Sequence, residues 1–119
     1  MRYTIHYYSE AVQTDIMALP ATLQARYISL TDRMQAYGPN LGEPHTKPFG
    51  GGLFELRLKG ADGIARVFYC TLVGRRVVML HSFIKKSDKT PLAELRIAAS
   101  RLKEVKNADS RADEGEDVR

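Results

Sequence analysis

Three segments rich in apolar residues follow one another closely between residues 53 and 84, and their spacing constrains the fold more than any other feature. The segments are 53–59, 64–73 and 77–84, and only short glycine-containing stretches separate them, Gly-Ala-Asp-Gly at 60–63 and Val-Gly-Arg-Arg at 73–76. Connections this short can join antiparallel strands, but they are too short for a crossover to a parallel strand. The sequence therefore predicts a meander of three antiparallel strands.

The first of these strands is amphipathic, whereas the other two are apolar on both faces. In segment 53–59, three apolar residues alternate with three charged ones, Phe54, Leu56 and Leu58 with Glu55, Arg57 and Lys59. Alternation of this kind places the two sets on opposite faces of a strand. Segment 64–73 is apolar apart from Arg66 and Thr71, and segment 77–84 is almost continuously apolar. Both patterns are typical of central strands that are covered on two sides.

The N-terminal part predicts one strand and two helices. Apolar and polar residues alternate from Arg2 to Tyr8, as in a half-buried strand. Ser9 is a suitable N-cap for a helix over 10–19, and Pro20 opens the next one. The apolar stripe of the second helix has helical spacing and consists of Leu23, Tyr27, Leu30, Met34 and Tyr37. Gly38 and Pro39 are expected to end it.

The remaining segments complete an α+β fold. Residues 38–52 are rich in glycine and proline and predict a loop, with Gly50–Gly52 as a flexible hinge. Thr90 and Pro91 open a last helix, whose inner stripe is expected to be Leu92, Leu95, Ala98, Ala99, Leu102 and Val105. Residues 1–106 are predicted to form one domain, an antiparallel and mostly meandering sheet with two N-terminal helices and one C-terminal helix packed on it. Residues 107–119 are polar and acidic, and they predict a disordered tail.

Length and composition restrict the class of protein. A chain of 119 residues fits one domain, and it contains no apolar run of the roughly 20 residues that a membrane helix needs. The N-terminus lacks the apolar stretch of a signal peptide, and Cys70 is the only cysteine, so we expect a cytoplasmic protein without disulfides. The last thirteen residues hold five acidic and two basic side chains, which leaves a net charge of +7 on the remainder of a chain whose total is +4. This excess favours polyanionic partners.

Several familiar kinds of catalytic site are disfavoured. His6, His45 and His81 are far apart and share no ligand-like spacing with acids, so no metal site and no cofactor is predicted. Gly50–Gly52 precedes a strand and lacks the Lys-Ser/Thr pair of a phosphate-binding loop. Cys70 lies inside an apolar strand and is interpreted as a buried, inert thiol. His81 follows an apolar run; a core histidine is the favoured interpretation, with an acid–base role as the alternative.

Basic residues interrupt the pattern where apolar ones are expected. Arg66 lies within an otherwise apolar strand, where an arginine must reach solvent at a cleft or meet an anion. Arg57 is on the charged face of the preceding strand. Lys85, Lys86 and Lys89 crowd the segment before the last helix. The cations of three strands can thus converge on one face of the sheet.

Four motifs in this region resemble those of the RelE-like toxins, specifically their HigB-like, phage-derived branch. They are Leu-Phe-Glu-Leu-Arg at 53–57, Arg-Val-Phe-Tyr at 66–69, Phe-Ile-Lys-Lys at 83–86 and Lys-Thr-Pro at 89–91. The motifs occur in the order found in that branch and lie within residues 53–104. Residues 3–106 match its architecture.

The resemblance implies the toxin of a type II toxin–antitoxin system, a metal-independent endoribonuclease that cleaves mRNA on the ribosome. In such a reaction the 2′-hydroxyl of one nucleotide attacks its own 3′ phosphate. By the motifs, Arg57 and Arg66 would grip this phosphate, and Lys85 and Lys86 would add charge or transfer protons. One of these lysines or Glu55 would be the general base, a choice that the sequence leaves open. Lys47, Lys59, Tyr69 and Lys89 are further candidates for contacts to RNA, with a core role as the alternative for Tyr69.

The same resemblance implies a partner and leaves two other functions open. The partner would be a HigA-like helix-turn-helix antitoxin that covers the basic face or displaces the last helix. The first alternative is a ParE-like inhibitor that binds DNA gyrase and has no nuclease activity. The second is a non-toxic module that binds nucleic acid, for which binding would weaken steeply with salt.

After Lys86 the chain has neither the tyrosine nor the histidine that some relatives use for proton transfer.

Overall fold

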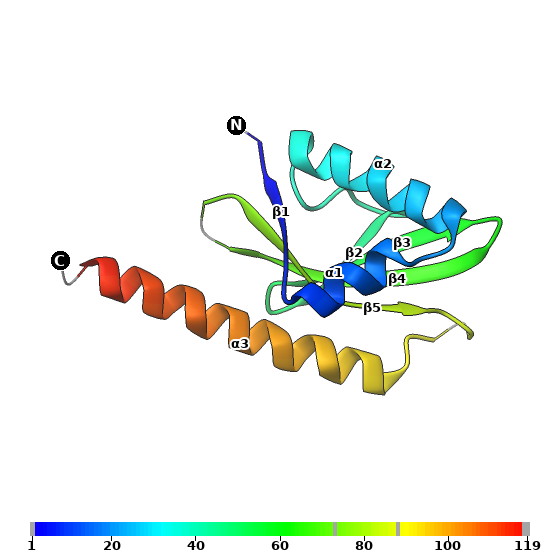
Figure 1. Ribbon diagram of the computed structural model, residues 1–119. Helices are drawn as coiled ribbons and strands as arrows, with labels where there is room; N and C mark the ends of the chain where they lie inside the picture. Colours follow the sequence, from blue (N-terminus) through cyan, green and yellow to red (C-terminus); the bar gives the residue numbers. More distant parts are fainter. Residues whose placement is uncertain (1, 73, 88, 118–119) are drawn as a thin grey trace.

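The chain folds into one mixed sheet of five strands with helices on both faces (Figure 1). This computed structural model describes residues 2–72, 74–87 and 89–117. In chain order the elements are β1 (Thr4–Tyr7), α1 (Glu10–Met17), α2 (Ala21–Tyr37), β2 (Thr46–Gly50), β3 (Leu53–Gly60), β4 (Gly63–Leu72), β5 (Arg76–Ile84) and α3 (Leu92–Asp117). The predicted α+β class is confirmed. Val73, which the sequence places at the end of a strand and in a turn, lies outside the described residues.

The meander is present, but the prediction of an antiparallel sheet is wrong at one edge. The strand order is β1-β5-β4-β3-β2, and neighbours from β2 to β5 are antiparallel. β1 instead runs parallel to β5, with Thr4 opposite Arg76 and Tyr7 opposite Met79. The chain between β1 and the meander passes through two helices, and a connection of that length allows either strand direction. The apolar pattern of a single strand does not encode the direction of its partner.

Segment 38–52 also differs from the prediction, because its second half is a strand rather than a loop. Thr46–Gly50 pairs with β3 at the edge of the sheet, with an irregularity between Pro48 and Gly50. An edge strand tolerates a proline because one side of its backbone needs no partner. Gly50, Gly51 and Gly52, expected as a hinge, form the tight turn from β2 to β3, and all three have positive φ, between 63° and 89°.

The first core lies between the sheet and helices α1 and α2. The Ser9 side chain accepts a hydrogen bond from the Val12 backbone N–H at 3.2 Å, which confirms the predicted N-cap. Four members of the predicted α2 stripe are buried there with residues of β3, β4 and β5, namely Leu23, Tyr27, Leu30 and Met34. The fifth, Tyr37, is 84% exposed because it lies in the last turn of the helix. The prediction that Tyr37 belongs to the buried stripe is therefore wrong.

The second core lies on the opposite face, under α3 (Figure 1). Ala98 is fully buried against the sheet, and Leu95, Leu102 and Val105 pack around it. Leu92 and Ala99, which the stripe also included, are exposed. Arg101 holds α3 to β5 by donating to the Leu80 carbonyl at 2.8 Å. The meander is therefore covered on both faces, as its apolar composition predicts.

Helix α3 is longer than the sequence indicates. The composition predicts that this helix ends near residue 106. In the structure it continues through Asp117, and its C-terminal end projects beyond the sheet (Figure 1). Polar residues such as those at 107–117 can continue a solvent-exposed helix once packing has formed its first turns. Residues 118 and 119 of the predicted tail lie outside the described part. Within the described residues, none of the helices combines the length and the hydrophobicity that a membrane span requires.

Candidate functional site

Strand pairing brings the charged residues of β3, β4 and β5 together on the α3 side of the sheet. Three rows of side chains cross these strands on this face. The first row is Glu55, Phe68 and His81, and the second is Arg57, Arg66 and Phe83. The third is Lys59 and Ile64, and Lys85 adjoins it because its N–H donates a hydrogen bond to the Ile64 carbonyl at 2.8 Å. Side chains in one row are direct neighbours, and those in adjacent rows are diagonal neighbours. We call Arg57, Lys59, Arg66 and Lys85 the cation cluster.

A buried carboxylate organises the two arginines of this cluster. Glu55 is only 2% exposed, and its Oε1 lies 3.4 Å from Nε of Arg57 and 3.5 Å from Nε of Arg66. Its other oxygen, Oε2, accepts a hydrogen bond from the Thr90 hydroxyl at 3.1 Å. A buried carboxylate needs such partners, because an unpaired charge in this position would be strongly disfavoured. Glu55 thus holds both guanidinium groups side by side and ties them to the segment before α3.

Arg66 is only partly satisfied by this arrangement. Its side chain is 11% exposed, and burial lowers its pKa, against a smaller opposing effect of Glu55. Nε is close enough to Glu55 for an ion pair, but it makes no hydrogen bond with any described residue. Buried polar groups without hydrogen bonds are uncommon and call for an explanation. This Nε is closed to solvent, so the 11% of the Arg66 side chain that is exposed lies on its other atoms.

A cavity of about 340 Å³ opens beside the two arginines. Arg57, Lys59 and Arg66 contribute to its wall, together with Ile64 and with three residues from other parts of the chain, Arg26, Pro44 and His45. Among the described residues, no acidic side chain lines it. The carboxylate of Glu55 contacts both arginines but does not line the cavity. The cavity has the charge and the hydrogen-bond donors of a site for an oxyanion such as a phosphate.

His81 and Glu94 form a second titratable pair on this face. His81 Nε2 and Glu94 Oε2 are in hydrogen-bond contact, and the side chains are 16% and 29% exposed. The ring of His81 stacks on Phe83 at 6.2 Å between centroids, and Phe83 is the cross-strand neighbour of Arg66. A carboxylate on one ring nitrogen fixes the orientation and tautomer of a histidine, which is how histidines are prepared for proton transfer. Sequence reasoning favoured a core histidine here. The sequence predicts that Glu94 lies in the first turn of the last helix, but its pairing with His81 depends on how α3 crosses β5.

The remaining predicted cations lie around the cluster rather than in it. Lys86 and Lys89 are exposed in the segment between β5 and α3. Lys47 is opposite Glu55 on β2, so it shares this face, and its Nζ lies 5.6 Å from the centre of the Phe49 ring. The structure therefore brings Glu55, Arg57, Lys59, Arg66 and Lys85 together. It leaves Lys47, Lys86 and Lys89 at the rim.

Tyr69 is not on this face, which corrects its proposed contact to RNA. It is fully buried among residues of α1, α2 and the sheet, stacks on Phe54, and donates a hydrogen bond to the Pro39 carbonyl. Adjacent residues of a strand point to opposite faces, so Tyr69 is directed away from the side that carries Arg66. Burial also raises its pKa above the usual tyrosine value. The core alternative given for this residue is the one that the structure supports.

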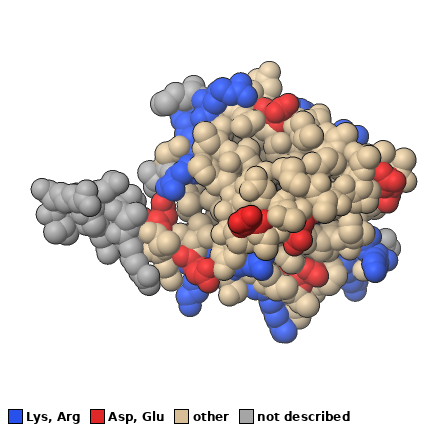
Figure 2. All heavy atoms as spheres, viewed as in Figure 1, with Lys and Arg blue, Asp and Glu red and all other residues tan. Residues whose placement is uncertain are grey.

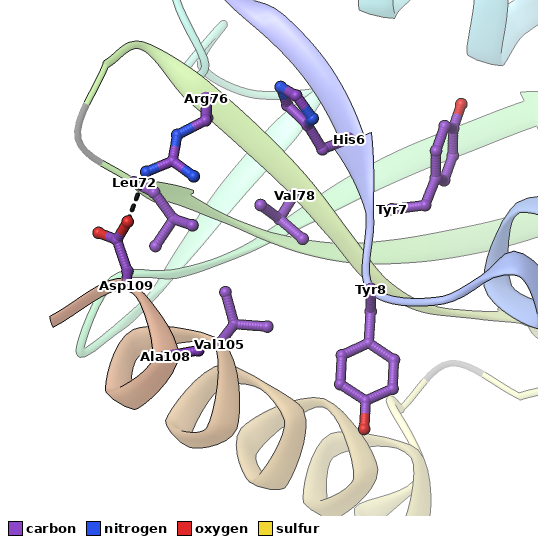
Figure 3. Close-up of a pocket in the computed structure, with 9 residues that line it drawn as sticks. All are labelled: His6, Tyr7, Tyr8, Leu72, Arg76, Val78, Val105, Ala108 and Asp109. Atoms are coloured by element: carbon purple, nitrogen blue, oxygen red, sulfur yellow. Dashed lines mark hydrogen bonds and ion pairs between the residues drawn. The ribbon is translucent and has the colours of Figure 1, made fainter. Parts of the chain in front are cut away.

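The surface outside this region offers a weaker case for a site. On the face drawn in Figure 2, basic and acidic side chains both occur, without one continuous basic patch. A cavity of about 300 Å³ lies at the other end of the sheet, between β1, β5 and α3 (Figure 3). An ion pair between Arg76 and Asp109 spans it and links β5 to α3. Most of its lining side chains are apolar or aromatic, and its Arg76 and Asp109 pair with each other, so it is a weaker candidate for a charged site than the cavity beside Arg57 and Arg66. Among the described residues, no three His, Cys, Asp or Glu side chains are grouped as a metal site requires.

The fold is similar to that of RelE. One solved structure, a double mutant of the E. coli toxin RelE in the free state, matches with a TM-score of 0.62 and 12% sequence identity, over 85% of this chain and 98% of that one. Another, the archaeal RelE–RelB complex from Pyrococcus horikoshii, matches with a TM-score of 0.52 and 20% identity, over 71% of this chain and 96% of that one. These likenesses show a shared fold. No curated protein sequence matches the chain significantly.

A family model gives the more direct relationship. The model described as phage-derived protein Gp49-like matches residues 14–103. The matched segment begins within α1, includes all of the meander and the cation cluster, and ends within α3. It also contains the four motifs on which the resemblance to phage-derived toxins rests. The chain therefore belongs to the Gp49-like family of phage-derived proteins, and it has the fold of the RelE toxins.

Proposed function

We propose that this protein is the toxin of a toxin–antitoxin pair and that it cleaves mRNA on the ribosome without a metal ion. The observation that carries the proposal is the pair formed by Arg57 and Arg66, held side by side by one buried carboxylate at the wall of a basic cavity. A net charge of +7 outside the last thirteen residues adds attraction for a polyanion. The Gp49-like family and the RelE-like fold agree with such a role.

In the proposed reaction, the 2′-oxygen of one nucleotide forms a bond to its own 3′ phosphorus, and the bond from phosphorus to the 5′-oxygen of the next nucleotide breaks. Negative charge accumulates on the phosphate oxygens as this happens. Guanidinium groups that are fixed before the reaction stabilise this charge without having to reorganise. In this proposal Arg66 binds one such oxygen and Arg57, beside it in the wall of the cavity, binds another.

The reaction also needs a base for the 2′-hydroxyl proton and an acid for the departing 5′-oxygen. Glu55 is poorly suited to either role, since Oε1 faces two arginines and Oε2 accepts from Thr90. We assign it the role of a positioning residue. His81, oriented by Glu94 and diagonal to Arg66, is our candidate for one proton transfer. Lys85 and Lys86 remain candidates for the other.

The partner in this proposal is a helix-turn-helix antitoxin of the HigA type, and the compartment is the cytoplasm, where ribosomes and mRNA are found. We expect the antitoxin to cover the cation cluster or to displace α3, whose first turn contacts His81 through Glu94. Co-expression with the neighbouring gene product tests this part. Failure of the two proteins to co-purify would count against it.

The central test is cleavage of a defined mRNA on purified ribosomes by the wild type and by Arg66→Ala. We expect cuts within the translated frame that require ribosomes and disappear in the variant, while circular dichroism shows that the variant remains folded. Undiminished cutting by a folded Arg66→Ala protein would refute the phosphate-binding role. A supercoiling assay with purified gyrase and no ribosomes addresses the ParE-like alternative. Inhibition there without RNA cleavage would replace the nuclease proposal.

A further inference from the structure

Two adjoining hollows run along the edge of β3, next to the cation cluster. The first is the cavity beside Arg57 and Arg66. The second, of about 320 Å³, is lined by Thr22, Ala25, Arg26, Ser29, Lys59 and Gly60. Arg26 and Lys59 line both, so the two hollows adjoin at these residues, and we call the two together the trough. Among the described residues, no acidic side chain lines either part.

The trough exists because β2 is shorter than β3. The last paired residues of the two strands are Thr46 and Leu56, and the Arg57 N–H makes one further hydrogen bond to the His45 carbonyl at 2.8 Å. Beyond this point β3 continues to Gly60 without a strand on that side. Alternate residues of an antiparallel strand direct their N–H groups to the same side, so the Lys59 N–H faces the open edge as that of Arg57 faces His45.

The far wall of the trough is fixed by a contact between α2 and the turn from β3 to β4. Asp62 Oδ2 accepts hydrogen bonds from the Thr22 backbone N–H at 3.1 Å and from its hydroxyl at 2.8 Å. The Asp62 N–H in turn donates to the Thr22 hydroxyl at 3.0 Å. Gly60 packs so closely on Thr22 that an added Cβ would lie 2.6 Å from Oγ1. The turn and the start of the helix are therefore held in one arrangement.

Arg26 lies one helical turn after Thr22, so this contact also sets its position relative to Lys59. It is exposed, and it forms no ion pair with any side chain that the structure describes. A solvated arginine on a helix is common, but this one shares two hollows with Lys59 and one with Arg57 and Arg66. Asp62 bonds to Thr22 at the wall and Glu55 to the two arginines, but among the described residues no carboxylate lines the hollows themselves, so the cations there favour an anionic ligand.

We propose that Arg26 and Lys59, with the Lys59 backbone N–H and the Ser29 hydroxyl, form a second phosphate site on the protein. This site binds the phosphodiester next to the one held by Arg57 and Arg66, so that the RNA strand leaves the reaction centre over the open edge of β3. The inference rests on the proposed function. It adds that the ligand is a polynucleotide gripped at two successive phosphates.

A titration followed by NMR tests the second site directly. The probes are 2′-O-methyl oligonucleotides, which cannot be cleaved: a dinucleotide with one phosphodiester and a trinucleotide with two. Chemical shifts of the arginine Nε–H groups report which side chains each probe contacts. We expect the dinucleotide to shift Arg57 and Arg66, and the trinucleotide to shift Arg26 in addition. Arg26→Gln should weaken trinucleotide binding by about threefold to tenfold and leave dinucleotide binding unchanged.

Arg33 provides a matched control, because it is an exposed arginine two turns further along the same helix and lines neither hollow. Arg33→Gln should bind both probes as the wild type does. If Arg26→Gln and Arg33→Gln weakened trinucleotide binding equally, Arg26 would act only through the overall charge of the protein, and the second site would be overturned. Shifts at Arg57 and Arg66 with none at Arg26 would overturn it while the primary site stands. No shift at Arg66 with either probe would contradict both sites.

Discussion

Glu55 and Arg66 are diagonal neighbours on adjacent strands, with Oε1 of the carboxylate 3.5 Å from Nε of the guanidinium. The carboxylate is almost completely buried, and the arginine is nearly so. The same oxygen also holds Arg57, so one negative charge is shared by two positive ones. This relationship leaves a net positive charge at the wall of the cavity. It predicts that the carboxylate matters for folding and for the orientation of the arginines.

Glu55→Gln tests this role. The substitution keeps the shape of the side chain but leaves two arginines without their counter-ion, and we expect it to lower the free energy of unfolding by about 1–3 kcal/mol. Thr90→Val is the matched control, since it removes only the hydrogen bond to Oε2 and should cost about 1 kcal/mol. Urea denaturation measures both values. An unchanged midpoint for Glu55→Gln would show that the pair does not stabilise the fold.

His81→Asn tests proton transfer by the histidine that Glu94 orients. If the proposed cleavage takes place, the substitution should lower kcat by about 10²–10⁴-fold, while oligonucleotide binding stays unchanged. Glu94→Gln should reduce kcat less, because it alters the orientation of the ring rather than removing it. A His81→Asn protein with an unchanged kcat would assign the proton transfer to another group.

Tyr69→Phe distinguishes a core tyrosine from one that contacts RNA. The substitution removes the hydroxyl that donates to the Pro39 carbonyl, and it should lower the free energy of unfolding by about 1 kcal/mol, as measured by thermal or urea denaturation. Binding of the 2′-O-methyl trinucleotide should not change, because the ring faces α1 and α2. Loss of oligonucleotide binding without loss of stability would contradict the buried position.

Gly60→Ala tests the close contact between α2 and the turn after β3. The new methyl group would lie 2.6 Å from Oγ1 and 2.9 Å from Cβ of Thr22, so the helix and the turn must separate. We expect a loss of about 1–3 kcal/mol in the free energy of unfolding, measured by urea denaturation. The variant Gly60→Ala/Thr22→Ala removes Oγ1 but also the hydrogen bonds to Asp62, so its loss should be smaller than the sum of the two single losses. Simple additivity would show that the clash is with Cβ and the backbone of residue 22 rather than with Oγ1.

Cys70 gives a prediction about pH. Burial raises the pKa of its thiol from 9.0 to about 11. Between these values the thiol ionises in the unfolded chain but not in the folded one, so its contribution to stability is complete below pH 9 and is lost as the pH rises toward 11. The difference in unfolding free energy between the wild type and Cys70→Ala should therefore narrow by about 1–2 kcal/mol from pH 8 to pH 10.5. A constant difference in urea denaturation would contradict a buried thiol.

The sequence by itself determined the features that depend on neighbours along the chain. Alternation from Phe54 to Lys59 predicts both the strand and the face that carries Glu55 and Arg57, because successive side chains of a strand point to opposite sides. The short turns predict the meander, and Ser9 predicts the start of α1, since turn length and capping are local properties. The position of Arg66 in an apolar strand makes it a candidate site residue for a similar reason, because the cost of burying a charge is a property of the residue itself.

Only the tertiary structure decided which distant residues meet. β1 pairs with β5 in parallel, α3 brings Glu94 to His81, and α2 brings Arg26 to Lys59. β2 forms in a glycine- and proline-rich segment because the edge of β3 offers it hydrogen-bond partners. Tyr69 is buried under α1 and α2, although its neighbour Phe68 faces α3. Each of these outcomes depends on how the segments pack against the sheet. Such packing brings together residues that are far apart in the chain, and the local sequence pattern does not predict these contacts.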